Sequence, residues 1–564
     1  MIIILLSWLY ILFTSVVVGV LSAKYIKVKS KSSIELSILG LFTTCVFGLL
    51  WAFFNPINEL FYSLYFLFVL ATAFYIKNDL KNIIRSKILL IKEIDSKLII
   101  FTLLFVFILA IQTASHPTLP DNESYYIQTI KWINHYGIVK GLGNLHLFFA
   151  QTSGWHVLQS IYNFNFLTEK LASLSGFLSF LMVLFSFKNL HLYFIEKKNL
   201  QLIFALLPVF IILFFPLINV PSPDVATYGI SLVVYYLFLN SEDSKESSFK
   251  LMVSFCVFLV LIKVTNLALL LIPLAFFFLE KEIKLKNNIL LVVITAFCFG
   301  VLFAKNGLLT GYIFYPIHSF GVWNDFYKIP NSVLDFFFSD AMRYNFFIDP
   351  VAFKNSSLPI IAKQWLFLSY SDLFFNASNL FCFAIIPFLI RKEKINSKIW
   401  IVYFILFFQF ILLIFSSPQY RFFLGTTLFF FAFIASFILN SKLKIYLSLV
   451  ASLLVLSAYT FVPQAFSLIS SNKIITNRSA FSVANLVMPS NITSLKTKFK
   501  IIKNQNLNYY SPTNPDLFWE TGNGPLPCVN QKQLDYFENY FNVIPQPIGL
   551  DLRDGFYSKK ITKP

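Results

Sequence analysis

The chain has 564 residues, of which 57% are hydrophobic, 19% are aromatic and only 13% are charged, and its mean hydropathy is +0.71. Because a soluble protein carries roughly one quarter charged residues, this composition excludes a soluble enzyme and indicates a chain that crosses a membrane many times. The formal net charge of +18 does not indicate nucleic-acid binding, because the basic residues fall mostly between apolar runs, where membrane topology places them.

Apolar runs of roughly 17–25 residues, the length that crosses a bilayer, recur along the first 460 residues. The closely spaced pairs at 35–76 and 249–281 leave re-entrant segments as an alternative, so we expect about 11–14 transmembrane helices. The approximate limits of the runs are 2–22, 35–54, 56–76, 98–114, 171–188, 200–218, 225–240, 249–264, 266–281, 288–304, 376–391, 399–416, 422–440 and 443–461.

The basic residues orient these spans. If the N-terminus lies outside, the lysine- and arginine-rich connections all fall on one side, which the positive-inside rule makes cytoplasmic. The long segments 115–170 and 305–375 then lie outside, together with the tail. We therefore predict an all-α polytopic membrane domain over 1–463 and a small α+β domain over 464–564 on the outer side. The basic connections are Lys24–Lys31, Lys77–Lys97, Lys188–Lys198, Lys281–Lys286, Arg391–Lys398 and Lys442–Lys444.

The segment that follows the span at 98–114 carries the clearest chemical signal. Two carboxylates, Asp121 and Glu123, precede a pattern typical of a helix that lies on the membrane surface. Asp121 or Asn122 can cap this helix, an apolar face begins at Tyr126, and Gly137 ends it. We expect the active site here, because long connections between spans are usually functional.

Other polar residues fall at the predicted outer ends of spans. Ionisable groups at membrane depth are costly, so they tend to be functional or paired. A structural interpretation exists for each kind: the acids cap helices, a lysine snorkels to the interface, and an arginine pairs with a carboxylate. Their gathering on one predicted face favours a binding site. The candidates are Asp224, Lys263, Lys305, Asn306, His318, Arg343, Tyr420 and Arg421, together with Tyr126 of the predicted surface helix.

The stretch PDNESYY, an acidic pair just after an early span followed by adjacent tyrosines, resembles the GT-C glycosyltransferases. These include protein O-mannosyltransferases and aminoarabinose transferases, whose motifs have the form Asp-Glu-x-x-Tyr. Here Asn122 stands between the acids, so both Asp121 and Glu123 are candidates for the base. The segments PSPD, LIKVTN, KNGLLTGYIFYP and LRDGF also resemble an uncharacterised family of bacterial membrane proteins, which implies a bacterial inner membrane and a site that faces the periplasm.

The resemblance implies a GT-C-like fold and transfer of a sugar from a polyprenyl-phosphate donor to an envelope glycan, lipid or protein. It implies that Asp121 is the base, that Glu123 is its partner or substitute, and that Asp224 binds the sugar or the acceptor. Lys263, Lys305 and Arg421 then hold the lipid phosphate. No metal is expected if these cations suffice, and the alternative is a divalent cation that bridges Asp121 and Asp224.

Three other functions stay open. A flippase or transporter predicts charges in mid-span and repeated halves, whereas this chain has charges at span ends and no internal repeat. An O-antigen polymerase or ligase would use 305–375 as its large outer loop, with Arg343 as the cation. A non-catalytic scaffold of an envelope complex would dock through the tail.

Overall fold

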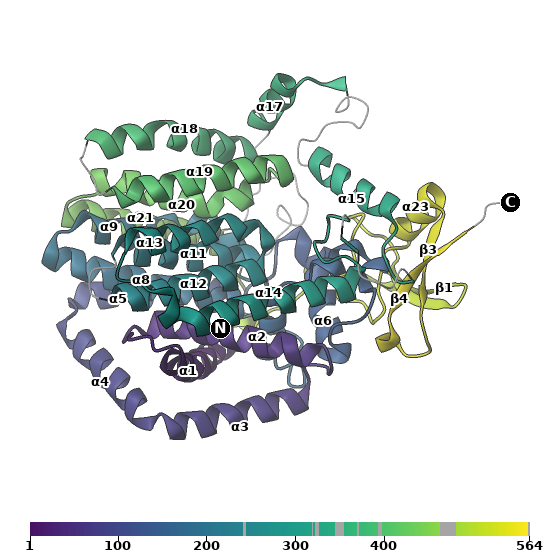
Figure 1. Ribbon diagram of the computed structural model, residues 1–564, viewed down its shortest axis with the longest axis horizontal. Coiled ribbons are helices and arrows are strands. Elements are labelled where there is room, and N and C mark those ends of the chain that lie inside the picture. Colours follow the sequence, from purple (N-terminus) through teal and green to yellow (C-terminus); the bar gives the residue numbers. More distant parts are fainter. Residues whose placement is uncertain are drawn as a thin grey trace.

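The computed structural model describes residues 1–240, 244–318, 320–321, 326–344, 355–368, 371–392, 397–462 and 481–561, with the backbone alone for 340–344. Within these ranges the chain is mostly helical, and its four strands lie near the C-terminus. Figure 1 shows most of the long helices running side by side, with the strands and α23 gathered at one end.

The helices of the first half are α1 (Ile2–Tyr25), α2 (Ser33–Ala52), α3 (Glu59–Tyr75), α4 (Lys77–Glu93), α5 (Ser96–Thr113), α6 (Ile127–Tyr136), α7 (Gly154–Tyr162), α8 (Leu174–Glu196), α9 (Asn199–Ala205), α10 (Leu207–Phe210), α11 (Pro223–Leu239) and α12 (Lys245–Ile262). Those of the second half are α13 (Leu271–Leu279), α14 (Ile289–Thr310), α15 (Asn331–Tyr344), α17 (Leu358–Leu366), α18 (Ser371–Lys392), α19 (Lys398–Ser416), α20 (Tyr420–Ile438), α21 (Lys442–Phe461) and α23 (Gln531–Phe541). The strands are β1 (Phe499–Asn504), β2 (Leu507–Pro512), β3 (Val543–Pro547) and β4 (Phe556–Lys560).

Among the described residues, nine helices are long and apolar enough to cross a membrane, or ten if the bent pair of α3 and α4 is one span. These nine are α1, α2, α5, α8, α14 with the turn before it, and α18 to α21. Three further predicted spans are shorter apolar helices, at Asn199–Leu213, Pro223–Leu239 and Val264–Leu279. The structure thus confirms a helical, multi-pass membrane protein. The predicted number of 11–14 spans is higher than the nine or ten described helices that meet the criteria of length and hydropathy.

The chain between α8 and α11 is broken into short helical pieces. Pro208 and Pro216 lack the amide hydrogen that a continuous helix needs, and a broken helix within a membrane requires other donors for its free carbonyls. Gln112 of α5 donates its amide to Phe215 O at 3.2 Å, and the Ser452 hydroxyl of α21 donates to Pro208 O at 2.8 Å. Side chains from neighbouring helices therefore hold this irregular segment, which leads the chain into α11.

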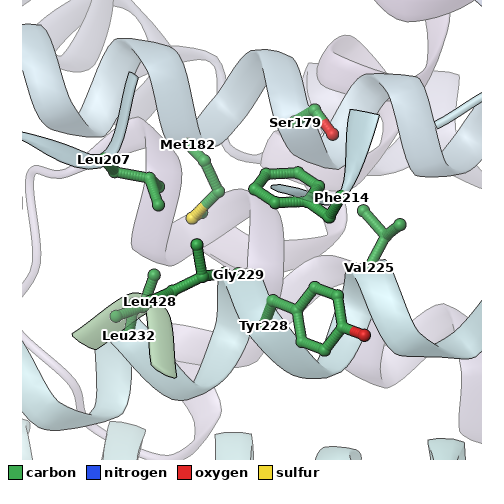
Figure 2. A pocket seen from close by; sticks show the side chains of 9 residues that line it. All are labelled: Ser179, Met182, Leu207, Phe214, Val225, Tyr228, Gly229, Leu232 and Leu428. Carbon is green, nitrogen blue, oxygen red and sulfur yellow. The ribbon is translucent and has the colours of Figure 1, made fainter. Parts of the chain in front are cut away.

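A small apolar void lies between α8, α10, α11 and α20 (Figure 2). Its volume is about 10 Å³, and Met182, Phe214, Tyr228 and Leu232 are among the side chains around it. A void of this size holds about one water molecule and has few polar groups to bind it. It is a packing defect beneath the N-terminus of α11, too small for a ligand.

The basic connections gather at one end of the helix bundle. Lys29 N donates to Ser247 Oγ at 3.0 Å, which joins the loop after α1 to the start of α12. Lys245 and Lys398 both pair with Glu280, at 2.9 and 3.0 Å, which joins the starts of α12 and α19 to the end of α13. These contacts agree with the predicted partition of the basic loops. That this end faces the cytoplasm stays a prediction.

The C-terminal residues pack against the segment 115–170 at the other end. Strands β1 and β2 form one antiparallel pair and β3 and β4 a second. Phe556 N donates to Lys140 O at 3.0 Å, and the Ser558 hydroxyl donates to Asn144 Oδ1 at 2.7 Å. Gly141 has φ +61°, and a Cβ there would lie 2.0 Å from Phe556 O. Strand β4 therefore lies close against the segment 115–170.

The predicted surface helix is present, but the predicted helix caps are not. It begins with a five-residue π-helical turn, Asn122–Tyr126, continues as α6, and ends at Gly137 with φ +76°, as predicted. Asp121 makes no capping hydrogen bond, so that expectation is wrong. Asp224 does not cap α11 either, because the Ser222 hydroxyl accepts the hydrogen bond from Asp224 N.

Most of the polar face of α6 is covered, although His135 in its last turn is exposed. Gln128 is fully buried and donates its amide to Gly524 O at 2.7 Å. Lys131 Nζ donates to Asn523 O at 3.3 Å. The predicted surface helix therefore has most of its polar face covered by C-terminal residues that are distant in the sequence, and its place at the membrane surface stays a prediction.

Candidate active site

Asp121 and Arg421 form an ion pair at the end of the bundle where the C-terminal residues pack. Arg421 Nη1 lies 2.6 Å from Asp121 Oδ2, and the two side chains are 20% and 23% exposed. The Tyr126 hydroxyl donates to the same carboxylate oxygen at 3.5 Å. Asp121 precedes the π-helical turn and Arg421 lies in the first turn of α20. Both charges are therefore partly accessible from outside the fold.

A second ion pair adjoins the first. Lys263 Nζ lies 2.5 Å from Asp224 Oδ1, and Arg421 Nε lies 4.0 Å from Asp224 Oδ2. Charges thus alternate in the order Asp121, Arg421, Asp224, Lys263, and we call these four residues the four-charge cluster. Opposite charges at these distances stabilise one another strongly where water is scarce. Asp224 is buried, whereas the other three side chains are partly exposed.

Each member of the cluster occupies the end of a helix. Asp224 is in the first turn of α11, where a negative charge is favoured by the helix dipole. Lys263 follows α12 in an extended conformation, φ −157° and ψ 118°, before the chain turns into a 3₁₀ segment. Arg421 is in the first turn of α20, where the dipole disfavours a cation. The two aspartates therefore supply the stabilisation that the helix end does not.

Neighbouring residues that the sequence analysis missed hold the two cations. Arg421 Nε donates to Gln419 Oε1 at 2.7 Å. The Phe422 ring lies beside both cations, with its centroid 3.3 Å from Lys263 Nζ and 5.1 Å from Arg421 Cζ. A cation over an aromatic ring is stabilised by the ring's electrons. The string SSPQYRFF carried this signal, since an amide lies two residues before the arginine and an aromatic ring follows it directly.

Aromatic side chains lie beside members of the cluster. The Tyr125 ring stacks on Phe148 with centroids 4.9 Å apart, and the Tyr126 centroid lies 4.9 Å from that of His156. Burial raises the pKa of the Tyr125 phenol above its ordinary value, and the nearby Asp121 charge acts in the same direction. Both effects keep this phenol neutral. Next to Arg421 in the chain, Tyr420 stacks on Phe375 of α18 with centroids 4.7 Å apart.

Lys305 and Asn306 do not pair with the four-charge cluster. Lys305 is buried and donates to Thr152 O at 2.5 Å. Asn306 donates its amide to Ile313 O at 3.0 Å. Both therefore bond to backbone carbonyls around the C-terminal end of α14, and the expected snorkelling of Lys305 toward water is not seen.

The remaining predicted ligands lie elsewhere or outside the described side chains. His318 Nε2 pairs with Asp335 Oδ1 at 2.9 Å, and both side chains are exposed. The Arg343 side chain lies outside the described residues. Of the predicted site residues, the structure brings together Asp121, Tyr126, Asp224, Lys263 and Arg421, with Tyr420 next to Arg421.

Glu123 connects the π-helical turn to the C-terminal residues. Its carboxylate is fully buried and accepts hydrogen bonds from Thr493 Oγ1 at 2.6 Å and Ser494 N at 3.0 Å. Its backbone carbonyl accepts from the amides of Thr521 and Gly522 at 2.9 and 2.7 Å. Burial raises the pKa of the Glu123 carboxyl above its ordinary value. Within the described part of the chain, these partners are separate from the four-charge cluster.

The divalent cation that the sequence left open as an alternative would compete with Arg421. The guanidinium contacts both aspartates that such an ion would bridge. Among the described residues, no group of three or more His, Cys, Asp or Glu side chains is placed to hold a metal ion. That no metal is needed stays a prediction, and the bridging cation stays its alternative.

Comparison with known proteins gives one match. A family model described as "Domain of unknown function (DUF8201)" matches residues 1–428. That range contains all four residues of the cluster, whereas the described C-terminal residues 481–561 lie beyond it. No curated protein and no solved structure matches the chain.

Proposed function

The chain belongs to the DUF8201 family, whose description assigns no activity, and we propose from the site itself that the protein is a GT-C-type membrane glycosyltransferase. It transfers a sugar from a polyprenyl-phosphate donor to an envelope glycan, lipid or protein at the outer face of the inner membrane. The observation that carries the proposal is the four-charge cluster, in which a partly exposed carboxylate lies 2.6 Å from a partly exposed guanidinium.

In the proposed reaction a carboxylate accepts a proton and the two cations stabilise the leaving phosphate. An acceptor hydroxyl attacks the anomeric carbon and loses its proton to Asp121. The bond from the anomeric carbon to the phosphate oxygen breaks, and the polyprenyl phosphate leaves with that electron pair. Arg421 and Lys263 stabilise the negative charge that the phosphate gains. A positioned base contributes about 10²–10⁴-fold to the rate, and fixed cations lower the barrier further.

The ion pairs explain how the partly buried cations are stabilised before a donor binds. Partly buried cations are costly without a counter-ion, and Asp121 and Asp224 supply the counter-ions here. A phosphate that binds the Arg421 guanidinium replaces Asp121 as its partner, because arginine binds phosphate and carboxylate with the same planar fork. Donor binding thereby frees the Asp121 carboxylate to take the acceptor proton.

The surrounding residues act as positioning groups in this proposal. Tyr126 donates to Asp121 and Gln419 accepts from Arg421, so each holds one member of the cluster in place. Asp224 keeps Lys263 oriented through the 2.5 Å contact. Glu123 is fully buried against Thr493. We therefore propose that Asp121 is the base and that Glu123 anchors the π-helical turn to the C-terminal residues.

The test compares cells and purified protein that carry Asp121→Asn with the wild type. Asn has a similar shape and still accepts a hydrogen bond, but it does not take the proton. We expect cells with Asp121→Asn to lack the glycan product, and the purified variant to release polyprenyl phosphate at least about 100-fold more slowly. The matched control is Asp516→Asn, which changes an exposed carboxylate near the same end.

Three results would overturn the proposal. The first is an unchanged envelope glycan profile in cells that lack the protein, combined with no consumption of any polyprenyl-phosphate sugar by the purified protein. The second is full transfer by Asp121→Asn. The third is a change in polymer length alone, with every sugar still present, which would favour the polymerase alternative.

A further inference from the structure

Helix α4 turns away from the spans. It follows α3 after a bend of 80°, and Figure 1 shows the two helices meeting at an angle along the edge of the bundle. All 17 residues of α4 are described and none of them is buried. Five are basic and two are acidic, so α4 is far too polar to lie in the hydrocarbon core. Because α3 has the length of a short span, the bend directs α4 along the membrane surface.

The outer surface of α4 has an apolar ridge. Ile84, Ile88 and Ile91 are between 51% and 59% exposed, and their spacing of i, i+4 and i+7 places them on one face. Leu80 and Ile83, on the neighbouring strip, pack partly against the bundle. The apolar surface of α4 is therefore wider than its contact with the spans, and the three isoleucines form the part of it that is exposed.

Basic side chains lie along one side of this ridge. Lys81, Arg85 and Lys92 are all exposed, and on a helical projection they lie beside the isoleucines. Asp79 and Glu93 lie on the far side of the polar face. An apolar ridge at the level of the acyl chains with cations just above it is the arrangement of a helix that binds an anionic membrane surface.

The position of α4 agrees with this arrangement. Lys77 Nζ lies 4.9 Å from the centroid of Phe74, and Lys24 Nζ lies 4.9 Å from that of Tyr75, so the junction of α3 and α4 adjoins the basic loop after α1. This is the end of the bundle where the other basic connections gather. Cations are thus concentrated where lipid phosphates of one leaflet lie.

We propose that α4 lies in the membrane interface and binds anionic phospholipid headgroups through Lys81, Arg85 and Lys92, with the isoleucine ridge inserted among the acyl chains. This binding is independent of the proposed glycosyltransferase activity. Phosphatidylglycerol and cardiolipin have the required charge, whereas phosphatidylcholine and phosphatidylethanolamine do not.

The test measures which lipids surround α4 in the full-length protein. The five cysteines of the chain are buried, so a fluorophore attached to Asn82→Cys on the exposed polar face labels α4 alone. The labelled protein is reconstituted in phosphatidylcholine vesicles that contain a small share of nitroxide-labelled lipid, either phosphatidylglycerol or phosphatidylcholine. We expect stronger quenching by nitroxide phosphatidylglycerol at low salt, and an equal effect of the two lipids at high salt.

A triple variant isolates the basic residues. Lys81→Gln, Arg85→Gln and Lys92→Gln together should abolish the preference, because each basic residue near an anionic surface favours it about fivefold. The control removes the same charge at the opposite end with Lys496→Gln, Lys498→Gln and Lys500→Gln, all exposed, and should keep the preference. Equal quenching by the two lipids in the wild type, or an unchanged preference in the α4 triple variant, overturns the proposal.

Discussion

Arg421 and Asp121 lie 300 positions apart in the chain, yet their side chains meet at 2.6 Å. The contact joins the start of α20 to the segment that follows α5, and it places a cation at a helix N-terminus, where the dipole opposes it. An arrangement that costs stability in this way is expected at functional sites more than in structural cores. Four predictions test the arrangement and its surroundings.

The first prediction concerns the planar fork of Arg421. Arg421→Lys keeps the charge but cannot place two nitrogens toward two aspartates and a phosphate. We expect sugar transfer by the purified full-length protein to fall about tenfold to a hundredfold, the equivalent of one charged hydrogen bond. Arg421→Gln should lose more, because it also leaves Asp121 without a counter-ion. Arg391→Lys, at an exposed site near the basic end, is the control and should transfer normally. Full activity of Arg421→Lys would show that charge alone suffices.

The second prediction concerns the coupling of Asp224 and Lys263. Because the pair is largely buried, Asp224→Asn and Lys263→Met should each lower the melting temperature of the detergent-purified protein. The double variant should lose less than the two losses combined, with a coupling of about 0.5–3 kcal/mol. The exposed pair of Glu196 and Lys198 serves as the control, and the same cycle should show no measurable coupling there. Additive losses at Asp224 and Lys263 would mean that the contact does not stabilise the fold.

The third prediction is a pH effect at His146. The imidazole accepts from Phe148 N through Nδ1, so Nε2 carries the hydrogen and donates to Trp519 O at 3.3 Å. Burial lowers the pKa of His146 to about 3, so the folded protein keeps the ring neutral where the unfolded chain binds a proton. The stability from this group is therefore complete above the ordinary pKa of about 6.5 and is lost as the pH falls toward 3.

The measurement for His146 is the melting temperature between pH 7 and about pH 4. The wild type should lose more stability on acidification than His146→Gln, and hydrogen exchange near Trp519 should accelerate in the wild type first. His135→Gln changes an exposed histidine on α6, and it should keep the pH dependence of the wild type. Identical pH profiles for the wild type and His146→Gln would refute the assignment.

The fourth prediction is the orientation in the membrane. Asn508 is exposed in β2, and Asn82 is exposed in α4 at the other end of the bundle. We expect a membrane-impermeant thiol reagent to label Asn508→Cys in spheroplasts and to label Asn82→Cys only after the membrane is opened. The buried native cysteines give a low background. Labelling of Asn82→Cys from outside would show that the orientation is the opposite one. The four-charge cluster would then face the cytoplasm, on the side of the membrane away from the proposed donor.

Much of this protein follows from local patterns in the sequence. Apolar runs predict spans because hydrocarbon tolerates little else, and nine of the described helices meet that test. Gly137 marks the end of α6 because only glycine readily adopts φ +76° where a Cβ would lie 2.3 Å from a carbonyl oxygen. Charges at the ends of apolar runs identified Asp224, Lys263 and Arg421, since such charges need a partner or a function. The acidic pair before the surface helix identified Asp121.

The partners of those charges depend on tertiary structure alone. Lys305 and Lys263 look alike in sequence, but Lys305 bonds to Thr152 O while Lys263 pairs with Asp224. Glu123 and Asp121 are two positions apart, yet the former is buried against Thr493, which lies 370 positions away. Sequence periodicity reports that a face is covered and does not report by what. Which carboxylate meets a cation and which one holds a distant segment is decided by how the helices pack, because ion pairs and hydrogen bonds act only over a few ångströms.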